Sequence, residues 1–166
     1  MTDNQIFQKQ RTRMVDKQIH LRGIQSEIVL SAMQKVARHK FVPSNRVDEA
    51  YGDRAMPIGF DQTISQPYTV AFQTQLLNPS ASEKILEIGT GSGYQTSILI
   101  YMKSRVYTLE RIFDLHRKAK TTLSKLNMHP NKIKWSDGYL GLSENAPFDK
   151  ILVTAGCPEI PYELLN

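Results

Sequence analysis

The sequence predicts an α/β protein with a doubly wound parallel sheet, preceded by a helical N-terminal segment. From Lys84 onward, short apolar stretches typical of strands alternate with stretches typical of helices, which is the pattern of a sheet with helices packed on it. The apolar residues 151–153 are consecutive, as in a parallel strand that is covered on both faces. A glycine-rich turn at 89–93 follows one predicted strand and opens one predicted helix.

The first half of the chain is predicted to be mainly helical. Residues 1–45 are expected to form helices, among which Ser26–Val36 carries apolar residues at helical spacing, with Ser26 as its N-cap. Glycine and proline residues in 46–68 predict an irregular loop, and such a loop in a compact domain is often functional. A further helix is expected at Tyr68–Leu77.

The second half is predicted to alternate strands and helices. Strands are expected at Lys84–Ile88, Arg105–Leu109, Lys132–Trp135 and Asp149–Thr154, and helices at Tyr94–Met102 and Ile112–Leu126. We expect the strand order 3-2-1-4 among these four strands. The length predicts one domain, in which residues 1–80 hold the helical segment and the loop, and residues 81–166 hold the α/β core.

Composition argues against several classes of protein. The chain has no run of about 18 apolar residues, and Met1–Arg13 has no apolar core of a signal peptide. The single cysteine, Cys157, excludes an internal disulfide and a cysteine-rich metal site, which fits a reducing, cytoplasmic location. The net charge of +5 comes from scattered basic residues, a pattern typical of a solvated surface rather than of a nucleic-acid-binding patch.

The segment Leu86–Tyr94, which reads LEIGTGSGY, is the main local indication of a ligand site. Glycines in such a turn permit a tight bend and a close approach of a ligand to the backbone. Tyr94 stands where a dinucleotide fingerprint requires glycine or alanine, and the lysine of a phosphate-binding loop is also absent. The ligand is therefore not expected to be held through a pyrophosphate.

Two acidic residues follow at the ends of later strands. Glu110 ends the second strand about 20 residues after the glycine turn, where a carboxylate accepts hydrogen bonds from both hydroxyls of a ribose. Asp137, before Gly138, follows the third strand and is placed to accept a hydrogen bond from an adenine amino group. Each acid alone also fits a helix cap, but in this order, with Glu87 ahead of the glycines, they predict a nucleoside site.

The segment Pro57–Tyr68 mixes apolar residues with hydroxyls and amides. Its composition fits a covering loop with satisfied turns, and it also fits a lid that carries Thr63 and Ser65 toward the glycine turn. The nearby acids, Asp53 among them, are interpreted as surface or turn residues. Trp135 is interpreted as a core residue, and none of the four histidines is expected to bind a metal.

These motifs together resemble the protein-L-isoaspartate O-methyltransferase family. The resemblance runs from about Met14 to Asn166, and its specific part is Gln62–Pro67 (QTISQP), because other methyltransferases that use S-adenosylmethionine lack it. The matching segments are Val36–Pro43, Ala50–Tyr51, Gln62–Pro67, Leu86–Tyr94, Asp137–Gly138 and Ala146–Asp149. Family members continue beyond the position of Asn166, so the resemblance predicts a truncated chain that lacks the last strands of a Rossmann-like methyltransferase fold.

The resemblance implies the activity and the site residues. Members transfer a methyl group from S-adenosyl-L-methionine to the α-carboxylate of L-isoaspartyl residues in damaged proteins, which initiates repair, without a metal. The resemblance assigns Ser65 to orientation of the substrate carboxylate. It assigns the cofactor to Thr63, Ile64, Glu87, Gly89, Gly91, Gly93, Glu110, Asp137 and Gly138.

Two alternatives and several further expectations accompany this interpretation. The chain could instead methylate another substrate, or be a non-catalytic or weakly active S-adenosylmethionine-binding module. Isoaspartyl-containing proteins and peptides are the expected partners, with no nucleic acid and no membrane. Self-association is expected through the exposed sheet edge, because a parallel strand left at an edge presents unpaired backbone groups.

Overall fold

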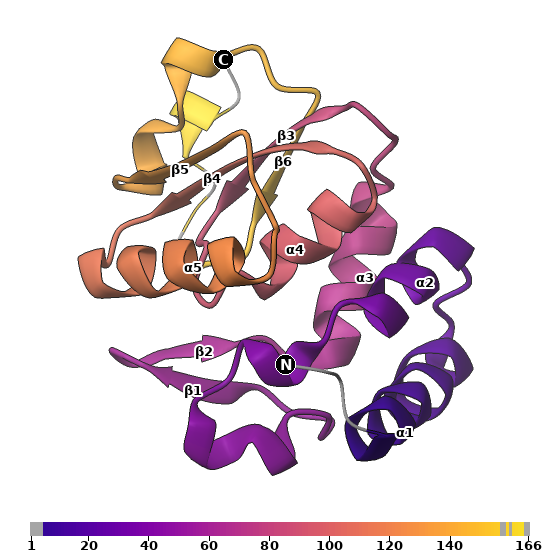
Figure 1. Cartoon of the computed structure of the whole chain (residues 1–166). Helices are drawn as coiled ribbons and strands as arrows, with labels where there is room; N and C mark the ends of the chain where they lie inside the picture. The colour runs from indigo at the N-terminus through magenta and orange to yellow at the C-terminus, as the bar shows by residue number, and fades with distance from the viewer. Residues whose placement is uncertain (1–4, 157–158, 160, 165–166) are drawn as a thin grey trace. The chain divides into compact units, whose positions relative to one another are not determined.

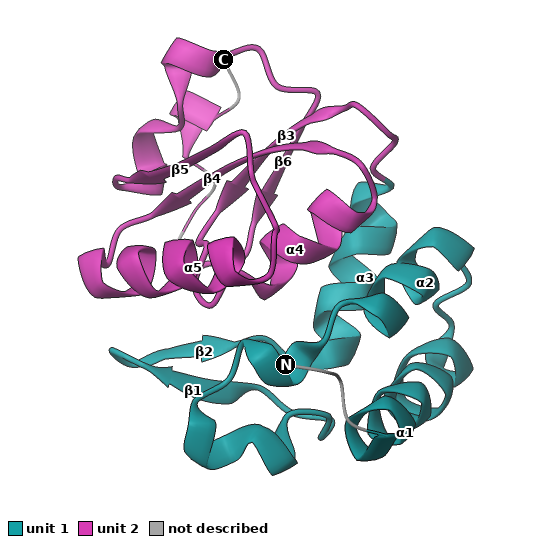
Figure 2. Ribbon diagram, viewed as in Figure 1, with its two compact units in different colours: residues 1–78 teal, residues 79–166 magenta. Residues whose placement is uncertain are grey.

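The computed structural model describes residues 5–156, 159 and 161–164. The chain divides into two compact units, residues 1–78 and 79–166 (Figure 2). The predicted boundary after residue 80 and the interpretation as one domain stay predictions. Cys157 lies outside the described residues.

The first unit begins with helices, as the sequence predicts. Its helical elements, in chain order, are α1 (Gln5–Arg13), the π-helical η1 (Met14–Ile19), η2 (His20–Arg22), α2 (Glu27–Lys35), η3 (Arg38–Lys40), η4 (Ser44–Glu49) and α3 (Pro67–Leu77). Helix α2 buries Val29, Ala32 and Met33, the stripe that its apolar spacing indicates. Ser26 occupies the N-cap position of α2, but its side chain makes no capping hydrogen bond.

The prediction of an irregular loop over 46–68 was wrong for residues 46–49, which are the end of η4, and for the hairpin that follows. Residues Met56–Gly59 (β1) and Gln62–Ile64 (β2) form an antiparallel hairpin in which Met56 pairs with Ile64 and Pro57 with Thr63 (Figure 1). The two residues at its tip, Phe60 and Asp61, both have φ of 54°. Such two-residue turns are usually marked by Asn-Gly or Asp-Gly, so Phe-Asp carried no hairpin signal.

The second unit contains the parallel sheet. Its strands are β3 (Lys84–Ile88), β4 (Arg105–Glu110), β5 (Lys132–Trp135) and β6 (Lys150–Val153). They are arranged in the order β5-β4-β3-β6, all parallel. This is the 3-2-1-4 order that the sequence predicts, and the predicted fold class is confirmed. The crossover helices α4 (Tyr94–Tyr101) and α5 (Phe113–Lys125) lie side by side against the sheet (Figure 1).

Four consecutive residues of β3, Ile85–Ile88, are buried, so both faces of this strand are covered, as expected for a parallel strand. One face carries a buried cluster of Leu86, Ile88, Leu109 and Leu142, against which Leu164 packs. All four strands have their carboxyl ends on the same side of the sheet, and the glycine turn follows β3 there. The fold therefore brings Glu87, Glu110 and Asp137 to the carboxyl ends of the strands.

The interpretation of Trp135 as a core residue was wrong. Trp135 ends the outermost strand β5 and is 56% exposed. Its ring packs edge-on against that of Phe113, with 5.1 Å between centroids, and its indole N–H donates to the carbonyl of Arg111 at 3.0 Å. Side chains on an edge strand are covered by neighbouring elements on fewer sides. The residue type alone does not indicate that Trp135 lies on such a strand.

Candidate functional site

The turn between β3 and α4 has the backbone that its glycines predict. Gly89, Gly91 and Gly93 have φ of 98°, 54° and 86°, which is the left-handed region that side-chain-bearing residues rarely adopt. The amides of Gly89 and Thr90 donate to the carbonyl of Leu109 at 2.9 and 3.0 Å. The turn is thereby held against the end of the neighbouring strand β4.

Glu110 holds the same turn through its side chain. Its Oε2 accepts a hydrogen bond from the amide of Gly91 at 2.8 Å, and its Oε1 accepts one from the amide of Ile112 at 2.9 Å. The side chain is 5% exposed. A carboxylate has about four acceptor sites, so each oxygen retains capacity for one further donor, which suits the two hydroxyls of a ribose.

Glu87 is the most deeply buried acid of the predicted site. Its exposure is 0%, and its Oε2 accepts a hydrogen bond from the Thr96 hydroxyl of α4 at 2.5 Å. Its Oε1 has no hydrogen-bond partner among the described residues. Burial raises the pKa of Glu87 to about 7, against the lowering effect of the hydroxyls of Thr96 and Thr108. The negative charge of Glu110 raises this pKa further.

Asp137 and Gly138 follow β5 and have identifiable structural roles. The exposed Asp137 caps a 3-10 turn (η5, Gly138–Leu140) by accepting from the amide of Tyr139 at 3.0 Å. A Cβ atom on Gly138 would lie 2.2 Å from Cγ2 of Ile88, so only glycine fits there. The amide of Ser136 donates to the carbonyl of Glu110 at 3.0 Å, which keeps this segment beside the end of β4.

The three site residues predicted in the first unit lie at the end of the hairpin. Thr63 is exposed on β2, whereas Ile64 is buried and pairs with Met56. Ser65 is half-buried between β2 and α3, and its hydroxyl forms no hydrogen bond within the described part of the chain. At the N-cap of α3, which is Gln66, no side chain supplies a capping hydrogen bond.

Asp53 has contacts that the sequence did not indicate. Its Oδ1 accepts from Nε2 of Gln66 at 2.7 Å, and its Oδ2 accepts from Nη1 of Arg22 at 3.0 Å. The Arg22 guanidinium also lies over the ring of Tyr68, 3.9 Å from its centroid. These contacts join residues 13 to 46 positions apart, so no local pattern reveals them. We call Arg22, Asp53, Gln66 and Tyr68 the Asp53 network.

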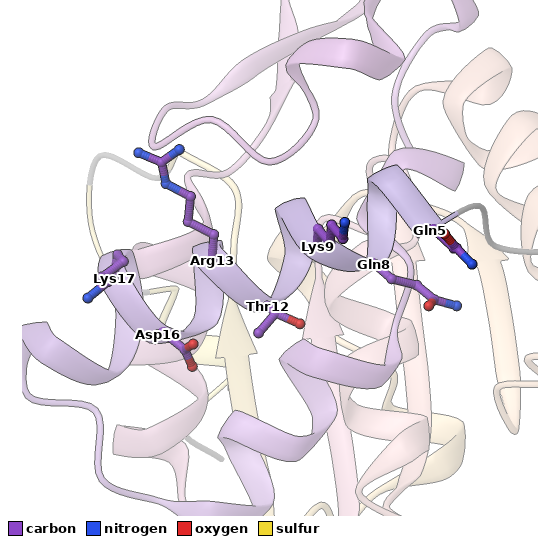
Figure 3. Close-up of a pocket in the computed structure, with 7 residues that line it drawn as sticks. All are labelled: Gln5, Gln8, Lys9, Thr12, Arg13, Asp16 and Lys17. Atoms are coloured by element: carbon purple, nitrogen blue, oxygen red, sulfur yellow. The ribbon is translucent and has the colours of Figure 1, made fainter.

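A shallow hollow of about 600 Å³, lined by residues of polar type, runs along α1 and η1. Figure 3 shows its lining side chains spaced along one helix: Gln5, Gln8, Lys9, Thr12, Arg13, Asp16 and Lys17. None of the predicted site residues lines it. Within the described ranges, no cluster of acids, histidines and cysteines is placed to hold a metal ion. No helix of this described part combines the length and apolar character that a membrane span requires.

Comparisons with known proteins agree with the motifs. Residues 9–166 match the family model described as protein-L-isoaspartate(D-aspartate) O-methyltransferase. A protein-L-isoaspartate O-methyltransferase of Christiangramia forsetii is 49% identical over 166 residues, which cover this whole chain and 78% of that protein. One from Geobacter metallireducens is 51% identical over 95% of this chain and 73% of its own length.

Solved structures show the same likeness. A protein-L-isoaspartate O-methyltransferase superimposes with a TM-score of 0.84 at 26% identity, over 93% of this chain and 51% of that chain. A Plasmodium falciparum structure of this kind, solved in complex with S-adenosyl-L-homocysteine, has a TM-score of 0.79 at 26% identity, over 93% of this chain and 78% of that chain.

Proposed function

This chain belongs to the protein-L-isoaspartate(D-aspartate) O-methyltransferase family, and on that premise we propose that it methylates the α-carboxylate of L-isoaspartyl residues in damaged proteins. The observation that carries the proposal is the family match over residues 9–166, which includes both the QTISQP segment and the glycine turn. The methyl donor is S-adenosyl-L-methionine, whose demethylated product is bound in the Plasmodium falciparum structure.

The second unit supplies a site that fits the nucleoside of the donor. Glu110 would accept from the two ribose hydroxyls, for which its oxygens retain acceptor sites. Asp137 and Gly138 would border the adenine. Glu87 with Gly89, Gly91 and Gly93 would border the methionine part, and Thr63 and Ile64 are proposed as further contacts to the donor. When bound, S-adenosylmethionine supplies a methyl group on a positively charged sulfur.

The substrate carboxylate needs orientation and no deprotonation. A carboxyl group with a pKa near 4 is already ionised at neutral pH, so the oxygen that accepts the methyl group is a ready nucleophile and no general base is required. We propose that the Ser65 hydroxyl, which has no partner within the described part of the protein, donates a hydrogen bond to this carboxylate. Alignment of the reacting atoms can contribute about 7–11 kcal/mol to catalysis.

A methyl-transfer assay with two matched peptides tests the proposal. The chain is expected to transfer methyl groups to a peptide that contains L-isoaspartate and not to its twin with normal aspartate. Transfer to neither peptide, with S-adenosylmethionine binding in calorimetry, would favour the non-catalytic binding module instead. Transfer to a small molecule or nucleic acid in place of both peptides would support the alternative of another substrate.

Glu110→Gln is expected to weaken binding of S-adenosylmethionine about 10- to 100-fold, because the ribose hydroxyls lose a charged acceptor worth roughly 1.5–3 kcal/mol. Glutamine keeps the shape of the side chain, but its single oxygen can accept through only one of the two positions that bind the amides of Gly91 and Ile112. Calorimetry measures the affinity, and thermal unfolding measures the cost to the fold. An unchanged dissociation constant in the folded variant would remove Glu110 from the nucleoside site.

We further propose that the partners are isoaspartyl proteins in the cytoplasm, and that the chain self-associates through its sheet edge. The single cysteine supports a reducing compartment. Strand β6 stands at one end of the order β5-β4-β3-β6, and an edge strand can pair with a second chain. Sedimentation velocity at rising protein concentration tests this, and a constant monomer value would contradict it.

A further inference from the structure

We propose that Asp53 is a positioning residue for methyl transfer, which holds the backbone of Ser65 through Gln66. The inference rests on the proposed role of Ser65 and adds to it a residue that lies 12 positions earlier in the chain. Asp53 does not contact the reacting groups itself. It acts on the residue that directly follows Ser65.

The contacts of Asp53 converge on the start of α3. Its Oδ1 and its backbone carbonyl both accept from Nε2 of Gln66, at 2.7 and 3.3 Å. Its Oδ2 accepts from Arg22, whose guanidinium covers the ring of Tyr68. The Tyr68 hydroxyl donates in turn to the carbonyl of Arg22 at 3.4 Å. Gln66 and Tyr68 are therefore held to a common group of side chains.

Ser65 lies between two fixed neighbours. On one side, Ile64 is buried and pairs with Met56 in the hairpin. On the other side, Gln66 is bound to Asp53 through its side chain, and its carbonyl accepts from the amide of Val70 at 3.1 Å as the first turn of α3 begins. The Ser65 side chain has no hydrogen bond of its own among the described residues. The position of its Cβ atom, from which the hydroxyl extends, is thus set by the backbone that these neighbours hold.

A purely stabilising role is the competing explanation, and the exposure of the pair argues against it. The side chains of Arg22 and Asp53 are 43% and 41% exposed, and ion pairs so exposed contribute little to stability. Small displacements of an orienting group, in contrast, strongly affect the rate, since about 1 Å can cost about 100-fold. Loss of Asp53 should therefore affect turnover much more than it affects folding.

The first test compares Asp53→Ala with Asp48→Asn, a change to an exposed carboxylate of the same unit. Asp53→Ala is expected to lower kcat for an isoaspartyl peptide about tenfold, with the dissociation constant of S-adenosylmethionine and the Tm nearly unchanged. Hydrogen exchange of the amides in 62–68, followed by mass spectrometry, should accelerate in this variant. Asp48→Asn should match the wild type in every measurement.

The second test exchanges donor and acceptor between the two positions. Gln66→Glu places a second carboxylate against Asp53 and should lower kcat to a similar extent. Adding Asp53→Asn should restore most of the loss, because the new amide at position 53 can donate to the new carboxylate at position 66. A residue that only filled space would show no such recovery.

The outcomes separate this inference from the proposed function. If the wild type methylates the isoaspartyl peptide and Asp53→Ala equals it, or if the exchanged pair shows no recovery in a folded protein, the positioning role is wrong and the proposed function stands. If the wild type methylates no isoaspartyl peptide, the proposed function fails and the positioning role fails with it. Hydrogen exchange in 62–68 then still reports whether Asp53 holds that segment.

Discussion

Replacing Ser65 with alanine is expected to lower kcat/KM for an isoaspartyl peptide by roughly 10- to 1000-fold, because an unaligned carboxylate rarely reaches the in-line geometry. The affinity for S-adenosylmethionine should be nearly unchanged, since Ser65 is not among the residues that are proposed to contact the donor. The Tm should also be unchanged, because the Ser65 hydroxyl makes no hydrogen bond in the described part of the fold. Kinetics, calorimetry and thermal unfolding measure the three quantities.

Two further variants control this experiment. Ser26→Ala alters another half-buried serine of the same unit whose side chain makes no cap, and it should leave kinetics unchanged. Ser65→Thr keeps the hydroxyl and should retain part of the activity. If Ser65 merely stabilised a turn, Ser65→Ala would lose stability in proportion to activity. A folded Ser65→Ala protein with wild-type turnover would contradict the orienting role.

The same mechanism predicts how methyl transfer depends on pH. No base removes a proton from the substrate, so kcat/KM should be flat across neutrality. The measurement should use a temperature well below the Tm, at which any effect of pH on stability leaves the folded fraction unchanged. A steep rise in activity between about pH 6 and 8 that persists in Glu87→Gln, and therefore does not come from the raised pKa of Glu87, would show that a catalytic base is present.

The spacing of apolar residues along the sequence was sufficient to predict the strands and helices of the second unit. The strands at Lys84–Ile88 and Lys132–Trp135 have the predicted bounds, the strand at Arg105 is one residue longer than predicted, and β6 is one residue shorter at each end. Parallel strands buried on both faces are continuous apolar runs, and the glycine turn marks where the first strand ends. The order of the strands was predicted from the alternation of strands and helices from Lys84 onward. Trp135 was misplaced because an edge position depends on neighbours in space.

The hairpin and the Asp53 network could not be predicted in the same way. The hairpin tip is made by Phe60 and Asp61, whose residue types do not mark a two-residue turn. Asp53 was interpreted as a surface residue because its partners, Arg22 and Gln66, lie 31 and 13 positions away in the sequence. A single sequence shows the spacing of its apolar residues and the residue types of its turns. It does not show which polar side chains, far apart in the chain, come into contact in the fold.

Replacing Glu87 with glutamine is expected to change how stability depends on pH. Burial raises the pKa of Glu87 from 4.5 to about 7 in the folded protein, so folding takes up a proton between these values. The contribution of Glu87 to the free energy of unfolding is thus fully present below pH 4.5 and falls as the pH rises to about 7. The total fall is about 3 kcal/mol, from 1.36 kcal/mol for each pKa unit.

Glutamine does not titrate, keeps the size of the side chain and retains an oxygen that accepts from Thr96, so the variant should lack this fall. Relative to wild type, Glu87→Gln should therefore gain about 3 kcal/mol between pH 4.5 and pH 7, measured by denaturant unfolding across that range. Taking the difference between the two proteins cancels the other titrating groups. The amide itself can also change the free energy of unfolding by an amount that does not depend on pH. Such a change shifts the whole curve of Glu87→Gln and leaves the gain between pH 4.5 and pH 7 the same.

Glu144→Gln provides a control of opposite sign. Hydrogen bonding to Lys134 lowers the pKa of Glu144 to about 2, so its contribution to stability is present above pH 4.5 and is lost as the pH falls toward 2. This variant should be less stable than wild type at neutral pH, with a difference that disappears in acid. If the curves of Glu87→Gln and wild type instead run parallel from pH 4.5 to 7, the folded protein holds Glu87 with an ordinary pKa. A second donor to its Oε1 would then have to be sought, because a buried carboxylate without one would not stay ionised.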